Sequence, residues 1–436
     1  MRKVLIITYY WPPSGGSSVQ RWLRFSGYLP EFGWTPVMYV PDNAQYPETD
    51  TTLEKEILPG LEIIRKPIAE PYGFYRKFTG IGKKNEIAAG MTLGSKPSVF
   101  SGLKNDLSMW IRGNFFIPDA RMFWIRPSVK FLTKYLQENE MDCIITTGPP
   151  HSLHLIGYQL NQRTKIPWVA DFRDPWTNID FYKELKLTRL ADKMHHRLEK
   201  RVLTTASHII AVGENMQQEF NTIGAKNVSV ITNGYDYTDI PKDKILPDKK
   251  FSILHIGTLS RTRNAVAFWK ALGQKAREDK NFAKDLEIKL IGNVDYAVIR
   301  SIEESGLTPF LNRISYLAHP EAMKAQHKAQ VLLLLINNSV NSKGILTGKF
   351  FEYLTANRPI LLVGPVDGDA AKILRETGAG RIAGFEDAAG LRRQVDELYD
   401  LYQQGRLAVT PIGTEKYSRR ELTRKLAQIL DKIKEQ

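Results

Sequence analysis

The chain has a single cysteine, Cys143, among its 436 residues. One thiol cannot form an intramolecular disulfide, and a cysteine-rich zinc site is excluded as well. Long apolar stretches are also lacking. The longest purely apolar run, Val331–Ile336, is much shorter than the roughly 20 residues that a membrane-spanning helix needs.

The N-terminal residues MRKVLIITYYWPP are basic and then apolar. The apolar part is too short for the hydrophobic region of a signal peptide and continues into a glycine turn, so we expect a cytoplasmic protein. The paired glycines Gly15 and Gly16 are not part of a GxGxxG motif, and no Walker lysine follows them. NAD binding and P-loop chemistry are therefore disfavoured.

Positive charge is in excess, with 61 Lys and Arg against 47 Asp and Glu, a formal net charge of +14. Residues 70–130 contribute ten of these cations against four acids, interleaved with aromatic side chains. The stretch fits either an insertion with a solvated basic face or a patch that contacts an anionic membrane surface or a lipid acceptor. Nucleic acid is not an expected partner, because no zinc-finger, RRM or helix-turn-helix signature accompanies the charge.

Short apolar runs such as 4–8, 143–147, 252–256 and 331–336 alternate with helical patterns along the whole chain. Continuous apolar strands separated by helices indicate parallel sheets covered on both faces. Because the pattern occurs twice, we predict an α/β protein with two Rossmann-like domains.

The polar, proline-containing stretch 234–250 is the expected joint between the domains. It suggests a first domain over 1–240 and a second over 245–412. Residues 415–436 carry an apolar stripe at helical spacing and predict a final helix, whose stripe consists of Leu422, Leu426, Ile429 and Ile433.

Three segments could face phosphate. Gly15 and Gly16 precede a helix, where free N–H groups can meet an anion. In HIGTLSRTRN, Gly257 ends a strand and Arg261 and Arg263 follow in the loop. A tight turn and a solvated basic loop remain the alternatives for these two segments.

The third segment is GILTGKFFEYL, where Gly348, Lys349 and Glu352 fall at the start of a helix. Lys349 and Glu352 share one helix face, where the lysine could neutralise phosphate and the carboxylate could bind a ribose diol. An exposed Lys–Glu pair with no ligand is the alternative.

The order of the motifs YYWPPSGG, TTGPPHS, ASHIIAVGENM, VITNGYD, HIGTLSRTRN and GKFFEYLTANRPILLVGP resembles the family 4 retaining glycosyltransferases of the GT-B fold. The resemblance implies two Rossmann-like domains that face each other across a cleft. It also implies a nucleotide-sugar donor bound mostly by the second domain, and a C-terminal helix, here 415–436, that completes the first.

By the resemblance, Glu352 binds the nucleotide ribose and Lys349 lies near the donor phosphates. Arg263 replaces the usual lysine of the first loop, Thr258 replaces the usual arginine, and Arg261 compensates for that change. The family glutamate eight residues before Glu352 is Gly344 here, so the donor sugar is left open.

In the first domain, the resemblance places Gly16 near the diphosphate or sugar, His151 near the transferred sugar and Asp171 towards sugar or acceptor. A histidine at a helix start without a ligand, and a structural ion pair for Asp171, are equally open interpretations.

The reaction implied is departure of the donor phosphate, with the new bond formed on the same face of the sugar. His151, Asp171 and Lys349 are the candidate catalytic residues. Cationic side chains would neutralise the diphosphate, so neither a metal nor a cofactor is expected. Asp367-Gly368-Asp369 spells DxD, but its place between a strand and a helix predicts a turn and a helix cap.

We therefore expect a hexosyltransferase-type enzyme that acts on a cell-envelope glycan, such as lipopolysaccharide, or on a lipid-linked acceptor, in the cytoplasm or at the inner face of the membrane. A sugar-nucleotide epimerase or phosphorylase of the same fold, and a non-catalytic nucleotide-sugar-binding protein, stay open as alternatives.

Overall fold

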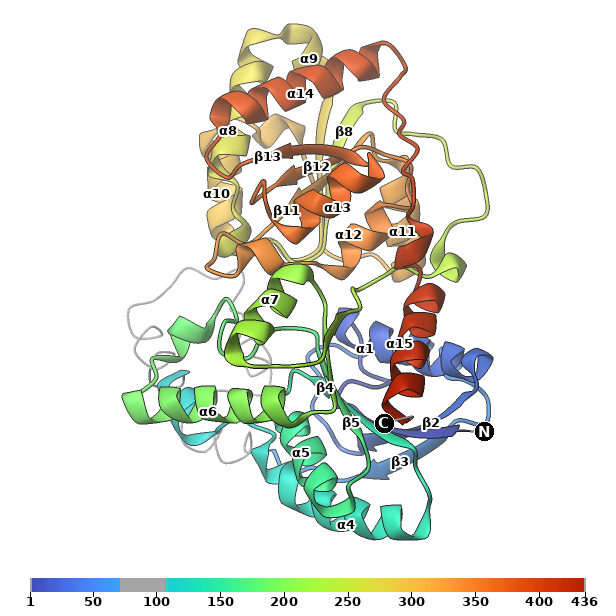
Figure 1. The fold of residues 1–436 in the computed structure, drawn as a ribbon. Helices are drawn as coiled ribbons and strands as arrows, with labels where there is room; N and C mark the ends of the chain where they lie inside the picture. The colour runs from blue at the N-terminus through green and yellow to red at the C-terminus, as the bar shows by residue number, and fades with distance from the viewer. Residues whose placement is uncertain (1, 71–106, 108, 435–436) are drawn as a thin grey trace. The chain divides into compact units, whose positions relative to one another are not determined.

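A computed structural model describes residues 2–70, 107 and 109–434 of the chain (Figure 1). It divides into two compact units. Unit 1 contains the described residues up to Thr232 together with those from Arg419 onwards, and unit 2 contains Asn233–Ser418. The stretch 234–250, which the sequence suggests as the joint, lies in unit 2. Most of the basic stretch 70–130 falls outside the described residues.

Unit 1 is built on a seven-stranded sheet in the order β3-β2-β1-β4-β5-β6-β7, and all its neighbouring strands run parallel. Val4, Leu5, Ile6 and Ile7 of the central strand β1 are fully buried, as expected of a strand covered on both faces. The strands are β1 Arg2–Ile7, β2 Trp34–Pro41, β3 Glu62–Lys66, β4 Cys143–Gly148, β5 Trp168–Phe172, β6 His208–Ala211 and β7 Val228–Val230.

Helices cover both faces of this sheet. One face packs against α1 and α15, and the other packs against α4, α5, α6 and α7. The helices are α1 Ser17–Tyr28, α4 Ile125–Glu138, α5 Ser152–Thr164, α6 Arg189–Thr205, α7 Glu214–Ile223 and α15 Arg419–Lys434.

The last helix, α15, starts at Arg419, four residues later than the sequence suggests, because 415–417 form a separate 3₁₀ turn. Its apolar stripe buries Leu422, Leu426 and Leu430 in the core of unit 1. Ile429, which the sequence placed in this stripe, is only partly buried. α15 lies alongside α1 in unit 1, where the family resemblance places the final helix.

Unit 2 holds a six-stranded parallel sheet in the order β10-β9-β8-β11-β12-β13. The strands are β8 Phe251–Ile256, β9 Leu286–Ile291, β10 Leu311–Ile314, β11 Val331–Leu335, β12 Ile360–Val363 and β13 Gly380–Ala383. The sequence pattern predicts β10 at 314–316, but the strand ends at Ile314 and Tyr316 is exposed. An edge strand with little apolar alternation gives only a weak signal.

In unit 2, α8, α9, α10 and α14 pack on one face of the sheet, and α11, α12 and α13 pack on the other. The helices are α8 Val266–Glu278, α9 Lys280–Asp285, α10 Tyr296–Glu304, α11 His319–Lys328, α12 Gly348–Tyr353, α13 Asp369–Thr377 and α14 Ala388–Gln403.

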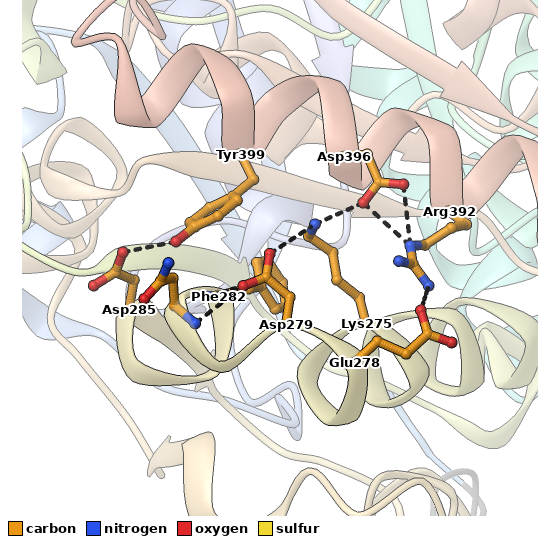
Figure 2. Close-up of polar contacts among 9 residues, drawn as sticks. Lys275, Glu278, Asp279, Phe282, Asp285, Arg392, Asp396 and Tyr399 are labelled. Atoms are coloured by element: carbon orange, nitrogen blue, oxygen red, sulfur yellow. Dashed lines mark hydrogen bonds and ion pairs between the residues drawn. The ribbon is translucent and has the colours of Figure 1, made fainter.

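A network of ion pairs joins α8, α9 and α14 (Figure 2). The buried Lys275 places Nζ 2.7 Å from Asp396 and 3.4 Å from Asp279. Arg392 bonds Glu278 at 2.8 Å and Asp396 at 3.1 Å. Because these residues come from different helices, the network fixes how the helices pack on the sheet.

Candidate functional site

Lys349 lies in the first turn of α12, and its side chain turns towards the carboxyl end of β8. Its Nζ donates to the carbonyl of Ile256 at 2.9 Å and contacts Nε2 of His255 at 3.1 Å. An ammonium group has three N–H donors, so these two contacts leave one for a ligand. Burial, followed by repulsion from Arg263, holds the pKa of Lys349 well below its usual range, while Glu352 acts in the opposite direction.

His255 is the residue that orients this ammonium. It is 1% exposed, and its Nδ1 lies 3.1 Å from the carbonyl of Leu333 on β11. A carbonyl can only accept, so Nδ1 carries the proton and Nε2 is the acceptor that faces Lys349. Burial, together with the charge of Lys349, keeps the pKa of His255 well below its usual value, so the imidazole is neutral.

The loop after β8 brings Arg263 to the same place. Its Nη1 donates to the carbonyl of Thr258 at 3.0 Å, and its Nε donates to Oδ1 of Asn337. The guanidinium is close enough to both Lys349 and His255 to lower the pKa of each. When Lys349 is protonated, two cations share this site, and an anion between them would relieve their repulsion and favour the protonated lysine.

Two glycines make the loop possible. Gly257 has φ +100°, and Gly292 at the end of β9 has φ +113°. A Cβ at Gly292 would lie 2.8 Å from the carbonyl oxygen of Gly257, so no side chain fits there. The carboxyl ends of β8 and β9 consequently approach each other through bare backbone, beside Nζ of Lys349.

Glu352 is partly exposed, one turn further along α12, and Oε2 accepts a hydrogen bond of 3.0 Å from Nε2 of Gln326. Gln326 comes from α11 and is 1% exposed. The amide holds one carboxylate oxygen, and the other makes no hydrogen bond to a residue that the structure describes. This is the arrangement in which a carboxylate can still accept from a diol.

Two further residues of unit 2, Gly348 and Arg261, are predicted to bind the nucleotide-sugar donor. Gly348 is the first residue of α12, and Arg261 is exposed in the short 3₁₀ turn 261–263. Gly344, which replaces the family glutamate, ends another 3₁₀ turn. The DxD sequence forms a cap and a helix start as expected: Gly368 caps α13, and Asp369 begins it.

In unit 1, the glycine turn packs against the segment that follows β2. The N–H of Gly15 donates to the carbonyl of Glu48 at 2.9 Å, and Gly16, with φ +78°, caps α1. A Cβ at Gly16 would lie 3.2 Å from a carboxylate oxygen of Glu48. The N–H of Gly15 is thus engaged within unit 1, and an acid lies beside Gly16, while the approach of these two glycines to a donor stays a prediction.

Asp171 is the next-to-last residue of β5 and is completely buried. Its carboxylate accepts from Arg21 at 2.8 and 3.2 Å, from Trp22 Nε1 at 2.9 Å and from Thr147 at 3.0 Å. Arg21 also binds the carbonyls of Ile231 and Thr232. Both carboxylate oxygens of Asp171 accept hydrogen bonds from buried donors, so this geometry matches the structural ion pair that the sequence left open for it.

His151 caps α5 and is 7% exposed. Its ring stacks on Trp176, with centroids 4.9 Å apart and planes 4° apart. Trp176 Nε1 in turn contacts Nδ1 of His195 at 3.1 Å. Burial, with the charges of His154 and Arg173, lowers the pKa of His151 well below its usual value, so the ring is a neutral hydrogen-bonding group.

Arg173 connects the start of α1 with the chain after β1 and the chain after β4, close enough to His151 to lower its pKa. Its Nη1 donates to the carbonyl of Ser18 at 2.9 Å, and its Nη2 donates to the carbonyl of Pro149. The guanidinium also lies 5.4 Å from the centroid of Tyr10. The predicted residues thus form two groups. Gly257, Arg263, Lys349 and Glu352 gather in unit 2, while His151 and Asp171 lie in unit 1.

Sequence reasoning missed His255, Gln326 and Trp176. His255 sits inside an apolar strand and Gln326 inside a helix, where a histidine or glutamine usually has a structural role. Only their contacts in three dimensions connect them to Lys349, Glu352 and His151.

The two parallel α/β sheets define the GT-B fold, and solved structures of that class match along nearly the whole chain. Residues 106–239, which contain the motifs TTGPPHS, ASHIIAVGENM and VITNGYD, match the family Glycosyltransferase Family 4, in agreement with the resemblance over that part of the chain. No curated protein matches.

Three similar solved structures illustrate the fold. One is a lipopolysaccharide outer core galactosyltransferase, WaaB, with 13% identity, a TM-score of 0.59 and 99% of each chain covered. Another is a mutant of S. aureus TarM in complex with UDP. It has 11% identity and a TM-score of 0.59, and the match covers 99% of this chain and 100% of the TarM chain. A third is sucrose-phosphate synthase from Thermosynechococcus elongatus, with 12% identity, a TM-score of 0.56 and 100% and 96% covered.

Within the part of the chain that the structure describes, no helix is both long and apolar enough to cross a membrane.

Proposed function

We propose that this protein is a retaining glycosyltransferase that moves a sugar from a nucleoside-diphosphate sugar to a cell-envelope glycan or a lipid-linked acceptor. The observation that carries the proposal is the pair of cations Lys349 and Arg263 beside the bare backbone of Gly257 and Gly292. Mutually repelling cations next to backbone that carries no side chains suit a diphosphate. The family match and the GT-B neighbours support the same choice.

In this proposal the bond between the anomeric carbon and the diphosphate oxygen breaks, and the acceptor oxygen bonds to that carbon on the same face. The acceptor proton passes to the departing phosphate oxygen. Lys349 and Arg263 stabilise the negative charge that develops on the diphosphate, so no metal or cofactor is required. Glu352, steadied by Gln326, binds the ribose hydroxyls.

His151 would meet the transferred sugar as a neutral hydrogen-bonding group, because its low pKa rules out the cationic form near pH 7. Asp171 would act only indirectly, by fixing Arg21 and the end of β5. Arg261 and Gly348 would contact the donor from the loop and the helix start.

The acceptor class rests on the overall positive charge and on similarity to proteins named for lipopolysaccharide and for glycan ligands. We place the reaction in the cytoplasm or at the inner face of the membrane, with contact to an anionic surface through residues 70–130.

Thermal unfolding with UDP, GDP and ADP tests the donor site. Two neighbours are described with UDP, which makes it the first probe. A ligand that binds only the folded protein stabilises it, by about 2.7 kcal/mol at 100 times its Kd. Lys349→Ala and Glu352→Gln should abolish the response, while the exposed controls Lys270→Ala and Glu303→Gln should keep it. No stabilisation by any of the three nucleotides would refute the proposal.

The next measurement is product formation from a panel of nucleotide sugars. Release of free nucleoside diphosphate supports transfer. Conversion of the sugar without release would instead indicate an epimerase, the activity for which one of the fold neighbours is named. Binding without either reaction would indicate a non-catalytic binding protein.

A further inference from the structure

The outer face of α6 carries basic and apolar side chains together. Its inner face is buried through Ala191, His195, Val202 and Leu203. The outward positions contain five cations and one acid, the half-buried Asp192. These cations are Arg189, Lys193, Arg197, Lys200 and Arg201.

Among the described residues, none of the five cations has a carboxylate partner. Within residues 2–70, 107 and 109–434, no ion pair involves Arg189, Lys193, Arg197 or Lys200, while Arg201 lies over the ring of Tyr158. Natural helices usually balance such a row with acids at i and i+4. An unbalanced row attracts an external anion.

Two large apolar side chains interrupt this row. Leu190 is 76% exposed and Met194, one helical turn further, is 47% exposed. Phe115 is 64% exposed and lies in a segment held at the start of α6, because its neighbour Asn114 donates to the carbonyl of Lys186 and accepts from the N–H of Thr188, the cap of α6. Phe181 adds a further exposed ring on the segment before α6.

We infer that this face of α6, with Phe115, is a docking surface for an anionic lipid bilayer. An interfacial helix has this composition: its cations contact lipid headgroups, and its apolar side chains enter the boundary with the acyl chains. A nucleic acid would neutralise the cations equally well, but it would leave Leu190 and Met194 in water and offers stacking only to planar side chains. The charge and the aliphatic exposure together therefore favour lipid.

The inference adds a described surface to the membrane contact of the proposed function, and it does not depend on the transfer reaction. Each cation near an anionic surface contributes about 1 kcal/mol, or roughly fivefold in partitioning. Leu190 and Met194 contribute a part of the binding free energy that salt does not screen.

The test is flotation of the full chain with vesicles of phosphatidylcholine alone or mixed with phosphatidylglycerol. We expect preferential flotation with the anionic vesicles. Lys193→Gln/Arg197→Gln/Lys200→Gln should lower partitioning on the order of 100-fold. Leu190→Ser/Met194→Ser should remove the binding that persists at high salt.

The matched control is Lys270→Gln/Lys280→Gln/Lys284→Gln, which removes the same charge from exposed positions of unit 2. An equal loss in both triple variants would show that net charge alone acts, and would overturn the inference. Equal flotation with both vesicle types, or binding of a labelled RNA in place of vesicles, would overturn it too. The UDP response of the α6 variants should stay unchanged, so failure here is separate from failure of the donor site.

Discussion

At the scale of single residues, His255 determines the state of Lys349. Because its Nδ1–H is committed to the carbonyl of Leu333, the other ring nitrogen can only accept, and it stabilises the ammonium form of a buried lysine. Burial already lowers the pKa of Lys349, so loss of this acceptor lowers it further.

We therefore predict that His255→Phe weakens UDP binding by about tenfold near neutral pH, since a hydrogen bond to a charged group is worth about 1.5–3 kcal/mol. The deficit should grow as pH rises, because a lysine with a lower pKa loses its charge earlier. Isothermal titration at pH 6.5 and 8.5 measures this, with the exposed His196→Phe as control. A deficit that is the same at both pH values would contradict the role of His255.

Asp171 leads to a prediction about stability. Asp171→Ala leaves Arg21 buried without its partner, which typically costs about 3–5 kcal/mol. Arg21→Met/Asp171→Leu removes both charges and should recover much of that loss. Urea unfolding measures the two variants. A stable Asp171→Ala protein with no activity would instead favour a catalytic role.

Residue types and their order were enough to predict a candidate site formed by Gly257, Arg263, Lys349 and Glu352. A lysine can neutralise phosphate and a glutamate can bind a diol, and their helical spacing after a glycine loop is visible in the sequence. Gly15 shows the limit. Its amide is taken by the carbonyl of Glu48, more than 30 residues away, and no local pattern records that contact.

At the scale of elements, parallel strands were predictable, because buried runs such as β11 consist of apolar residues throughout. Edge strands and helix starts were not predictable from the sequence. β10 carries two exposed polar residues, Asn312 and Arg313, so the sequence pattern predicts the strand a few residues too late, at 314–316. The start of α15 depends on tertiary contacts at 415–418 that propensity does not contain.

The start of α9 gives a prediction on pH. Asp279 caps this helix by accepting from the N–H groups of Asn281 and Phe282 at 3.0 Å each, and the Phe282 contact is the main cause that holds the pKa of its carboxyl low. A lowered pKa means that the stabilisation is present above the unfolded value, about 3.9, and is lost as pH falls through the folded one.

Asp279→Ala should therefore cost about 1 kcal/mol at pH 7, and the difference from wild type should shrink at pH 3. Asp279→Asn keeps a capping oxygen and should lose less. Chemical denaturation at both pH values measures the effect. A difference independent of pH would show that the charge of Asp279 contributes nothing.

At the scale of the whole molecule, each unit has its own sheet and its own buried clusters, but unit 1 is completed by the far end of the chain. α15 fills one face of the sheet of unit 1 and ties to it through polar contacts at both ends. Arg2 bonds Asp431 at 2.6 Å, Trp34 Nε1 bonds the same carboxylate at 2.8 Å, and Arg420 bonds Glu31 at 2.7 Å.

Leu426 is fully buried at the centre of this helix face. Leu426→Ala should destabilise unit 1 by about 2–5 kcal/mol, as removal of a buried leucine does when the cavity cannot collapse. Hydrogen exchange should then rise in α1, β1 and α15, while β8 and α12 of unit 2 keep their protection and the protein keeps its UDP response. The exposed Gln428→Ala on the same helix should change neither. If exchange rose equally in both units, the two would unfold together, and α15 would stabilise the entire chain and not unit 1 alone.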